Sequence, residues 1–174
     1  ALIVTKFLGG TEVKVSAFIL VEKNSIIPIE NLLLDVQETC LEAKLNLVFG
    51  IQDIDSEENM KHCALGISLP AQQVSDHGEI NNTIRVDVYD EPAPHQYREL
   101  EWRDTGQIYF NTLIIDEVYQ HEVVALTFLY HFLMRYPQMV VWMEEDWVYT
   151  LSDLEKALKT SNQSDWCYVN PNSI

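Results

Sequence analysis

The chain has 174 residues, of which 47% are hydrophobic, and 27 acidic side chains against 11 lysines and arginines give it a net charge of −16. This length and hydrophobic content predict a single globular domain over residues 1–174 with a packed core. The negative charge argues against binding to nucleic acids and to anionic membranes, because their phosphate groups would be repelled.

The negative charge is unevenly distributed along the chain. Residues 1–50 contain 6 acidic and 4 basic side chains, whereas residues 51–174 contain 21 and 7. An acidic surface attracts basic protein surfaces and steers them into encounter. The sequence therefore favours a basic protein as the partner.

The three cysteines predict a reducing environment. Cys40, Cys63 and Cys167 show no C-x-x-C spacing, and an odd number leaves one of them unpaired in any disulfide scheme. Cys40 and Cys63 fall on apolar faces of the expected elements, so we interpret them as small buried hydrophobic residues. No apolar run reaches the roughly 18 residues of a membrane span, and no signal peptide is expected. We therefore expect a cytoplasmic protein that does not bind membranes.

The first half of the chain predicts a strand, a helix and then further strands. An alternating and then continuous apolar pattern predicts a strand within Glu12–Glu22. Apolar residues at helical spacing predict an amphipathic helix over Pro28–Lys44. The other expected elements are a strand at Leu45–Ile51, a short acidic surface helix at Asp53–Lys61, a strand at Cys63–Leu69, a polar loop at Gln72–Asn82 and a strand at Ile84–Tyr89.

A long apolar helix dominates the second half. Asp116 as the N-cap, Arg135 in the last turn and Pro137 beyond it predict a helix over Asp116–Tyr136. The stretch from Thr150 to Asp153 resembles a capping box, with Asp in place of Glu, and predicts a last helix to about Lys159. The other expected elements are strands at Gln107–Ile115 and Met139–Met143, and a polar tail at 160–174 that docks through Trp166 and Tyr168.

This order of elements predicts an α+β fold, with helices packed on one face of a mixed β-sheet. Two topologies remain open. The first is a ferredoxin-like arrangement. The second is a duplicated strand–helix–strand unit, with one copy in residues 13–51 and the other in 107–143.

The second predicted helix carries the nearest approach to a metal-binding motif. His121-Glu122 begins like the H-E-x-x-H signature, but position 125 is alanine, so the motif is incomplete and no metal site is predicted. His121 and His131 are ten residues apart, which separates them by about 15 Å along a helix. The glycine-rich motifs that bind nucleotides are absent, so no cofactor is predicted either.

An enzyme remains one alternative, because catalytic residues on separate elements leave no local signature. A small-molecule or metal-dependent site of this kind would draw on dispersed histidines and glutamates, of which the candidates are His95, Glu99, His121, Glu122 and His131. His62 and Cys63 do not add to it as a base and thiol pair. Neighbours on a strand point to opposite faces of the sheet.

The favoured interaction site is an acidic run between two tryptophans. Glu144, Glu145 and Asp146 could pair with lysines or arginines of a partner, while Trp142 and Trp147 would supply the apolar anchor. The alternative interpretation is a solvated turn whose tryptophans belong to the core.

The favoured function is therefore a non-enzymatic interaction protein that binds a basic protein surface, as an inhibitor or immunity-type partner would. The alternatives are the dispersed-site enzyme and a structural homo-oligomer that associates through the aromatic-rich C-terminal half.

Overall fold

The structure is a computed structural model and describes residues 15–70, 83–90, 97–99, 108–143 and 147–173. In chain order, its elements are β1 (Ala17–Glu22), η1 (Lys23–Ser25), α1 (Ile29–Ala43), β2 (Asn46–Ile54), β3 (Met60–Ser68), β4 (Thr83–Tyr89), β5 (Tyr97–Glu99), β6 (Ile108–Ile115), α2 (Glu122–Arg135), β7 (Val140–Met143), β8 (Val148–Tyr149), α3 (Leu151–Lys159), η4 (Gln163–Tyr168) and η5 (Pro171–Ser173).

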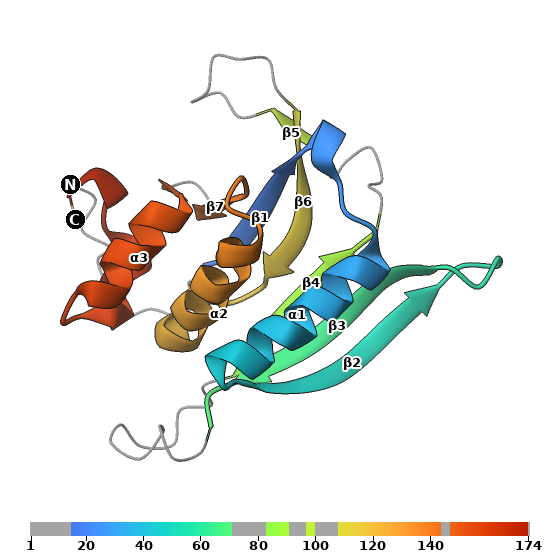
Figure 1. Ribbon diagram of the computed structural model, residues 1–174, viewed down its shortest axis with the longest axis horizontal. Helices are drawn as coiled ribbons and strands as arrows, with labels where there is room; N and C mark the ends of the chain where they lie inside the picture. The colour runs from blue at the N-terminus through green and yellow to red at the C-terminus, as the bar shows by residue number, and fades with distance from the viewer. Residues whose placement is uncertain (1–14, 71–82, 91–96, 100–107, 144–146, 174) are drawn as a thin grey trace, which may run out of the picture.

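The strands form one sheet in the order β2-β3-β4-β6-β1-β7-β8, with β5 paired to β6. The helices α1, α2 and α3 lie on one face of this sheet (Figure 1), so the predicted α+β class is confirmed. Every strand pair in the described part of the chain is antiparallel, where a mixed sheet was predicted. The crossovers through α1 and α2 join strands that are not neighbours in the sheet, which is why they add no parallel pair.

The two strand–helix–strand stretches differ in how they sit in the sheet. β1 and β2, which flank α1, are separated in the sheet by β6, β4 and β3. β6 and β7, which flank α2, are separated by β1 alone. The two stretches therefore do not occupy equivalent positions in one repeated layout.

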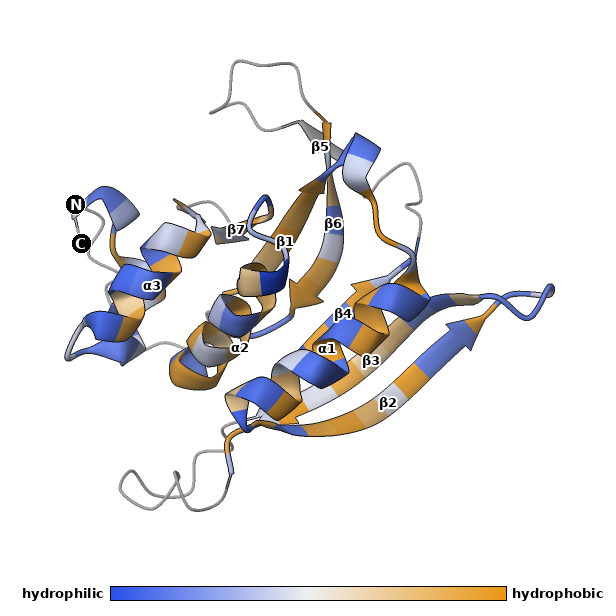
Figure 2. Ribbon diagram, in the orientation of Figure 1, coloured by the Kyte–Doolittle hydropathy of each residue, from blue (hydrophilic) through white to orange (hydrophobic). Residues whose placement is uncertain are grey.

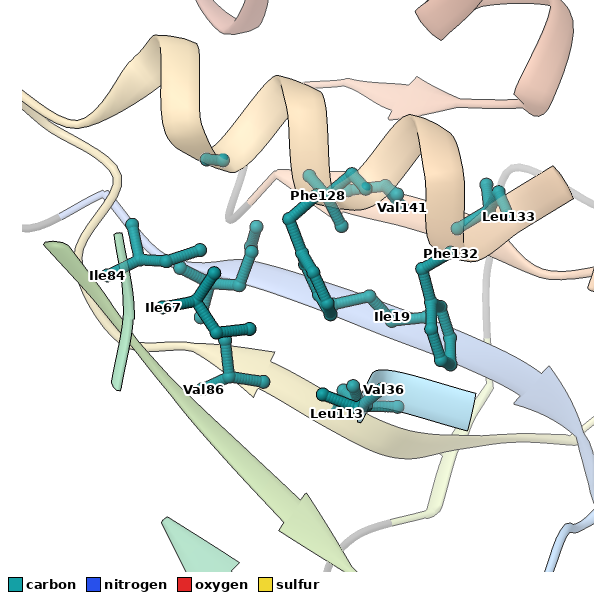
Figure 3. Close-up of a cluster of buried hydrophobic side chains, with 14 of the residues drawn as sticks. Ile19, Val36, Ile67, Ile84, Val86, Leu113, Phe128, Phe132, Leu133 and Val141 are labelled. Atoms are coloured by element: carbon teal, nitrogen blue, oxygen red, sulfur yellow. The ribbon is translucent and has the colours of Figure 1, made fainter. Parts of the chain in front are cut away.

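The main core lies between the helices and the sheet. Figure 3 shows Phe128 and Phe132 of α2 above Ile19 of β1 and Leu113 of β6. All four side chains are 0% exposed. Alternate residues of β1, β3 and β4 enter this core, so the apolar positions of these strands and the apolar stripes of the helices are buried together.

The first and last helices confirm the boundaries expected from their sequences. α1 begins at Ile29, directly after Pro28, and ends at Ala43. Its C-cap is Lys44, whose φ of 56° is left-handed and whose N–H donates to the last carbonyls of the helix. At α3 the Thr150 hydroxyl accepts from the Asp153 N–H, and the Asp153 carboxylate accepts from the Thr150 N–H at 2.9 Å. The predicted capping box is therefore present.

Two expected elements are wrong. Residues Asp53–Lys61 form the end of β2, a turn and the start of β3, not a short helix. The Asp55 carboxylate accepts from the backbone N–H groups of Glu57 and Asn59 at 2.8 and 2.9 Å, and Glu58 adopts a φ of 65°. Side-chain capping of this kind competes with helix formation and stabilises a turn.

The helix predicted from Asp116 begins six residues later, at Glu122. Gln120 has a φ of 67°, a left-handed conformation that interrupts the helical path just before α2 starts. The Val118 N–H donates to the Val15 carbonyl at 2.8 Å, so this segment is bound to the residues that precede β1 and does not form a helical turn.

The C-terminal segment docks as predicted. Trp166 is 2% exposed, and its Nε1–H donates to the Glu122 carbonyl at 2.8 Å. The Tyr168 hydroxyl donates to the Glu122 carboxylate, also at 2.8 Å. These contacts fix η4 against the first turn of α2.

The cysteines are free and buried, which confirms the interpretation of Cys40 and Cys63 as hydrophobic residues. Burial raises the pKa of the Cys40 thiol from 9.0 to about 11. Burial, together with the nearby Glu122 carboxylate, raises the pKa of the Cys167 thiol to about 12.

These thiols predict a loss of stability in alkali. Above pH 9.0 the unfolded thiols ionise while the folded ones stay neutral, so the free energy of unfolding falls as the pH rises from about 9 towards 11 to 12. Urea unfolding at pH 8 to 11 measures the effect, and a chain with Cys40→Ala and Cys167→Ala should show a smaller fall. A stability that is constant across this range would contradict the prediction.

Candidate functional site

Five residues of β2, β3 and β4 form an open-face cluster on the side of the sheet away from the helices: Asp53, His62, Arg85, Asp87 and Tyr89. Strand pairing sets Asp53 opposite His62 and His62 opposite Tyr89. Cys63, the neighbour of His62, is buried in the core under the helices. Because side chains alternate along a strand, His62 and its partners lie on the other face. The expectation that His62 and Cys63 point apart is confirmed.

The cluster is a chain of charged contacts across three strands. His62 Nδ1 lies 2.8 Å from Asp53 Oδ2, and its Nε2 lies 2.6 Å from Asp87 Oδ1. Arg85 donates to both Asp87 oxygens, at 3.0 Å from Nε and 2.9 Å from Nη2. The Tyr89 ring stacks on His62 with centroids 4.8 Å apart. The Asp87 carboxylate is thus held by two cationic or donor groups although the residue is only 6% exposed.

This arrangement is poorly suited to acid–base catalysis. His62 Nδ1 faces Asp53 and its Nε2 faces Asp87, so carboxylates of the chain itself occupy both ring nitrogens. Neither nitrogen is left to face the reacting group of a substrate. The Asp87 carboxylate also raises the pKa of the Arg85 guanidinium. Burial raises the pKa of the Tyr89 hydroxyl, and the Asp87 charge adds a smaller rise. The cluster therefore ties three strands together.

A second group of charges lies between α1 and α2. Asp35, Glu38 and Glu42, here called the carboxylate cluster, share one face of α1 because they are spaced at i, i+3 and i+7. Arg135 of α2 reaches all three, with Nη1 2.7 Å from Glu38 and 3.7 Å from Asp35, and Nη2 2.6 Å from Glu42. The Tyr136 hydroxyl donates to Asp35. Burial and this contact raise the pKa of Tyr136.

The carboxylate cluster keeps an excess of negative charge. One guanidinium faces three carboxylates, and α1 itself contains four acidic residues and no basic one. The Glu38 and Glu42 side chains are each 58% exposed. Met134, next to Arg135 in the chain, is 55% exposed. The carboxylates of Glu38 and Glu42 are therefore accessible to a partner.

The residues proposed for a dispersed enzyme site have separate local contacts. His121 is the N-cap of α2, and the Glu122 carboxylate accepts from the Tyr168 hydroxyl and the Gln120 N–H. His131 lies ten residues after His121 along the chain, and its ring contacts that of Tyr130 with centroids 5.2 Å apart. Glu99 lies in β5, and His95 falls outside the described residues. Within the part of the chain that the structure describes, no group of three or more histidine, cysteine, aspartate or glutamate side chains is arranged to hold a metal ion.

The two tryptophans predicted as one anchor pack into different clusters. Trp142 contacts Phe18 with ring centroids 5.4 Å apart, in an apolar cluster on the open face of the sheet. Trp147 packs against the main core under the helices. The acidic residues between them, 144–146, lie outside the described residues, so their role as a binding site stays a prediction.

A shallow depression of about 360 Å³ lies where the chain enters α1. Its lining residues are Lys23, Asn24, Ile26, Ile27, Pro28 and Asp90. Asp90 is held by Lys61, whose Nζ donates to it at 3.1 Å.

Sequence reasoning did not identify the open-face cluster or the carboxylate cluster. The signal for the first was Arg85, Asp87 and Tyr89 at alternate positions of one strand, and for the second the acidic residues at helical spacing. No helix of the described residues is long and apolar enough to cross a membrane. Comparison with protein-family models, curated proteins and solved structures finds no match to this chain.

Proposed function

We propose that this chain is a non-enzymatic interaction protein that binds a basic surface of another protein through the carboxylate cluster of α1, as an inhibitory or immunity-type partner would. The observation that carries the proposal is the three carboxylates that share one guanidinium, two of them on half-exposed side chains. A lysine or arginine from a partner would add the missing positive charge.

The surroundings of the cluster support binding to a protein. Met134, which precedes Arg135 in α2, is an exposed apolar side chain, and interfaces combine an apolar anchor with charged groups that exclude wrong partners. The overall charge of −16 adds long-range attraction for a basic partner. His62, whose ring nitrogens both face carboxylates, gives no comparable support to an enzymatic role.

The proposed location is the cytoplasm. The three described cysteines are free, which is the state that a reducing compartment maintains. The proposal needs neither nucleic acid nor a cofactor.

The test is binding by variants that differ in where charge is lost. Basic proteins captured from lysate at low salt are titrated with the wild-type chain, with Glu38→Gln plus Glu42→Gln, and with the control pair Glu117→Gln plus Glu155→Gln. The control removes the same charge from exposed sites away from the carboxylate cluster. We expect the first pair to weaken binding by about tenfold or more and the control by less than about threefold. Equal effects of the two pairs would contradict the assignment to α1.

A further inference from the structure

The two edges of the sheet are protected very differently. At one edge β8 is only 2 residues long, and short edge strands resist pairing with other chains. At the other edge β2 is 9 residues long, and among the described strands it pairs with β3 alone. Along the margin of the molecule β2 is a long ribbon that is largely apolar (Figure 2). Only Asp53 is charged among its nine residues.

Exposed apolar side chains concentrate around this edge. Of the nine large apolar residues that are exposed in the described part of the chain, six belong to α1 and β2 and form what we call the β2 edge surface: Leu34, Leu41, Val48, Phe49, Ile51 and Ile54. Leu41 is 78% and Val48 67% exposed. Phe49 lies opposite the core residue Leu65 and faces the helix side, whereas Val48 lies opposite Gly66 and faces the other side. The exposed apolar residues therefore flank the β2 edge on both faces of the sheet.

The leucines of α1 lie on the side of the helix that faces this edge. Asp35 and Glu42 contact Arg135, so their side of α1 is turned towards α2. Leu34 and Leu41 each precede one of these residues, and a step of about 100° around the helix turns them away from α2. The helix covers β2, β3 and β4, so the side away from α2 is the side of the free edge (Figure 1).

We propose that the β2 edge surface binds the same surface of a second copy of this chain. The two β2 strands would pair antiparallel about a twofold axis near the middle of the strand, and the sheet would continue through both copies. Leu34 and Leu41 of one α1 would then pack against those of the other. In a twofold dimer the same patch of both copies forms the contact, so the patch must be complementary to itself.

The charges at the two ends of β2 complement each other in this arrangement. Antiparallel pairing sets the start of one strand beside the end of the other. Lys44, exposed just before β2, would lie beside the turn of the other copy, where Asp53, Asp55, Glu57 and Glu58 are close in sequence. Backbone contacts to Asp55 hold that turn in shape. This match favours a second copy of the chain over an unrelated basic segment, because Lys44 would repel the positive charges of such a segment.

This inference goes beyond the proposed function and concerns a different surface. The dimer rests on backbone hydrogen bonds and apolar contact at β2, whereas partner binding rests on charges between α1 and α2. Glu38→Gln plus Glu42→Gln should therefore leave the dimer intact. The dimer should also persist in 0.5 M NaCl, where charge-driven binding is strongly screened.

The first test is sedimentation equilibrium of the whole chain, in which we expect a species of twice the chain mass. Val48→Lys plus Ile51→Lys should raise the dimer dissociation constant by about 100-fold or more, because a lysine pair blocks an edge. The matched control, Ile108→Lys plus Met134→Lys, changes two exposed apolar residues elsewhere and should leave the dimer unchanged. Thermal unfolding verifies that all variants are folded. A monomeric wild-type chain, or an equal effect of both pairs, would overturn the proposal.

A charge exchange tests the antiparallel geometry. Lys44→Glu alone should weaken the homodimer, as should Glu57→Lys plus Glu58→Lys, because each places like charges together at both ends of the contact. A mixture of the two variants should form a heterodimer in preference to either homodimer, because both ends then pair opposite charges. If the mixture forms no more heterodimer than chance predicts, the antiparallel pairing of β2 is wrong.

Discussion

Replacement of Asp87 with alanine is expected to lower the free energy of unfolding by about 3 kcal/mol. The carboxylate accepts two hydrogen bonds from Arg85 and lies 2.6 Å from His62 Nε2, on a residue that is 6% exposed. Its loss removes the acceptor of both groups and leaves two neighbouring donors without their partner. Urea unfolding of the two chains measures the difference.

Asp53→Ala is the matched control, because it removes the other carboxylate that contacts His62. The Asp53 side chain is 65% exposed, so solvent replaces its contact and the expected loss is below about 1 kcal/mol. If Asp53→Ala destabilises the chain as much as Asp87→Ala, the view that Asp87 is the centre of the cluster is wrong.

Replacement of Phe128 with alanine is expected to have a still larger effect, a loss of about 4 kcal/mol. Phe128 is 0% exposed, stacks on Phe132 with centroids 5.7 Å apart, and fills the space between α2 and the sheet (Figure 3). The smaller alanine side chain would leave a cavity. The helix and the sheet can close it only in part, because other core residues already fix their separation. Urea unfolding again measures the change.

Met134→Ala, on the same helix but 55% exposed, serves as the comparison and should cost less than about 1 kcal/mol. A loss below about 1 kcal/mol for Phe128→Ala itself would contradict the placement of this face of α2 in the core.

Local patterns predicted most of the elements. The boundaries of α1 and the capping box of α3 follow from residues close together in the chain, namely Pro28 before the first helix and Thr150 with Asp153 at the last. The prediction was wrong where a side chain redirected the backbone. Asp55 turned an acidic segment with helical composition into a hairpin, and the left-handed Gln120 delayed α2.

The functional surfaces depend on contacts that local patterns do not contain. His62 and Asp87 are 25 residues apart and meet only because β3 and β4 pair in one register. Arg135 meets Glu42 across 93 residues through the packing of two helices. Leu34 and Leu41 fall outside the apolar stripe of α1, and neither is among its buried residues. Their helical spacing could therefore have indicated from the sequence that they are exposed.

Charge-driven binding through α1 is tested most directly by the salt dependence of the affinity for the captured basic protein. Between about 50 and 500 mM NaCl we expect the wild-type affinity to fall by at least about tenfold, and the fall to be smaller for Glu38→Gln plus Glu42→Gln. An affinity that does not change with salt, or a salt dependence that these substitutions leave intact, would contradict the proposed function.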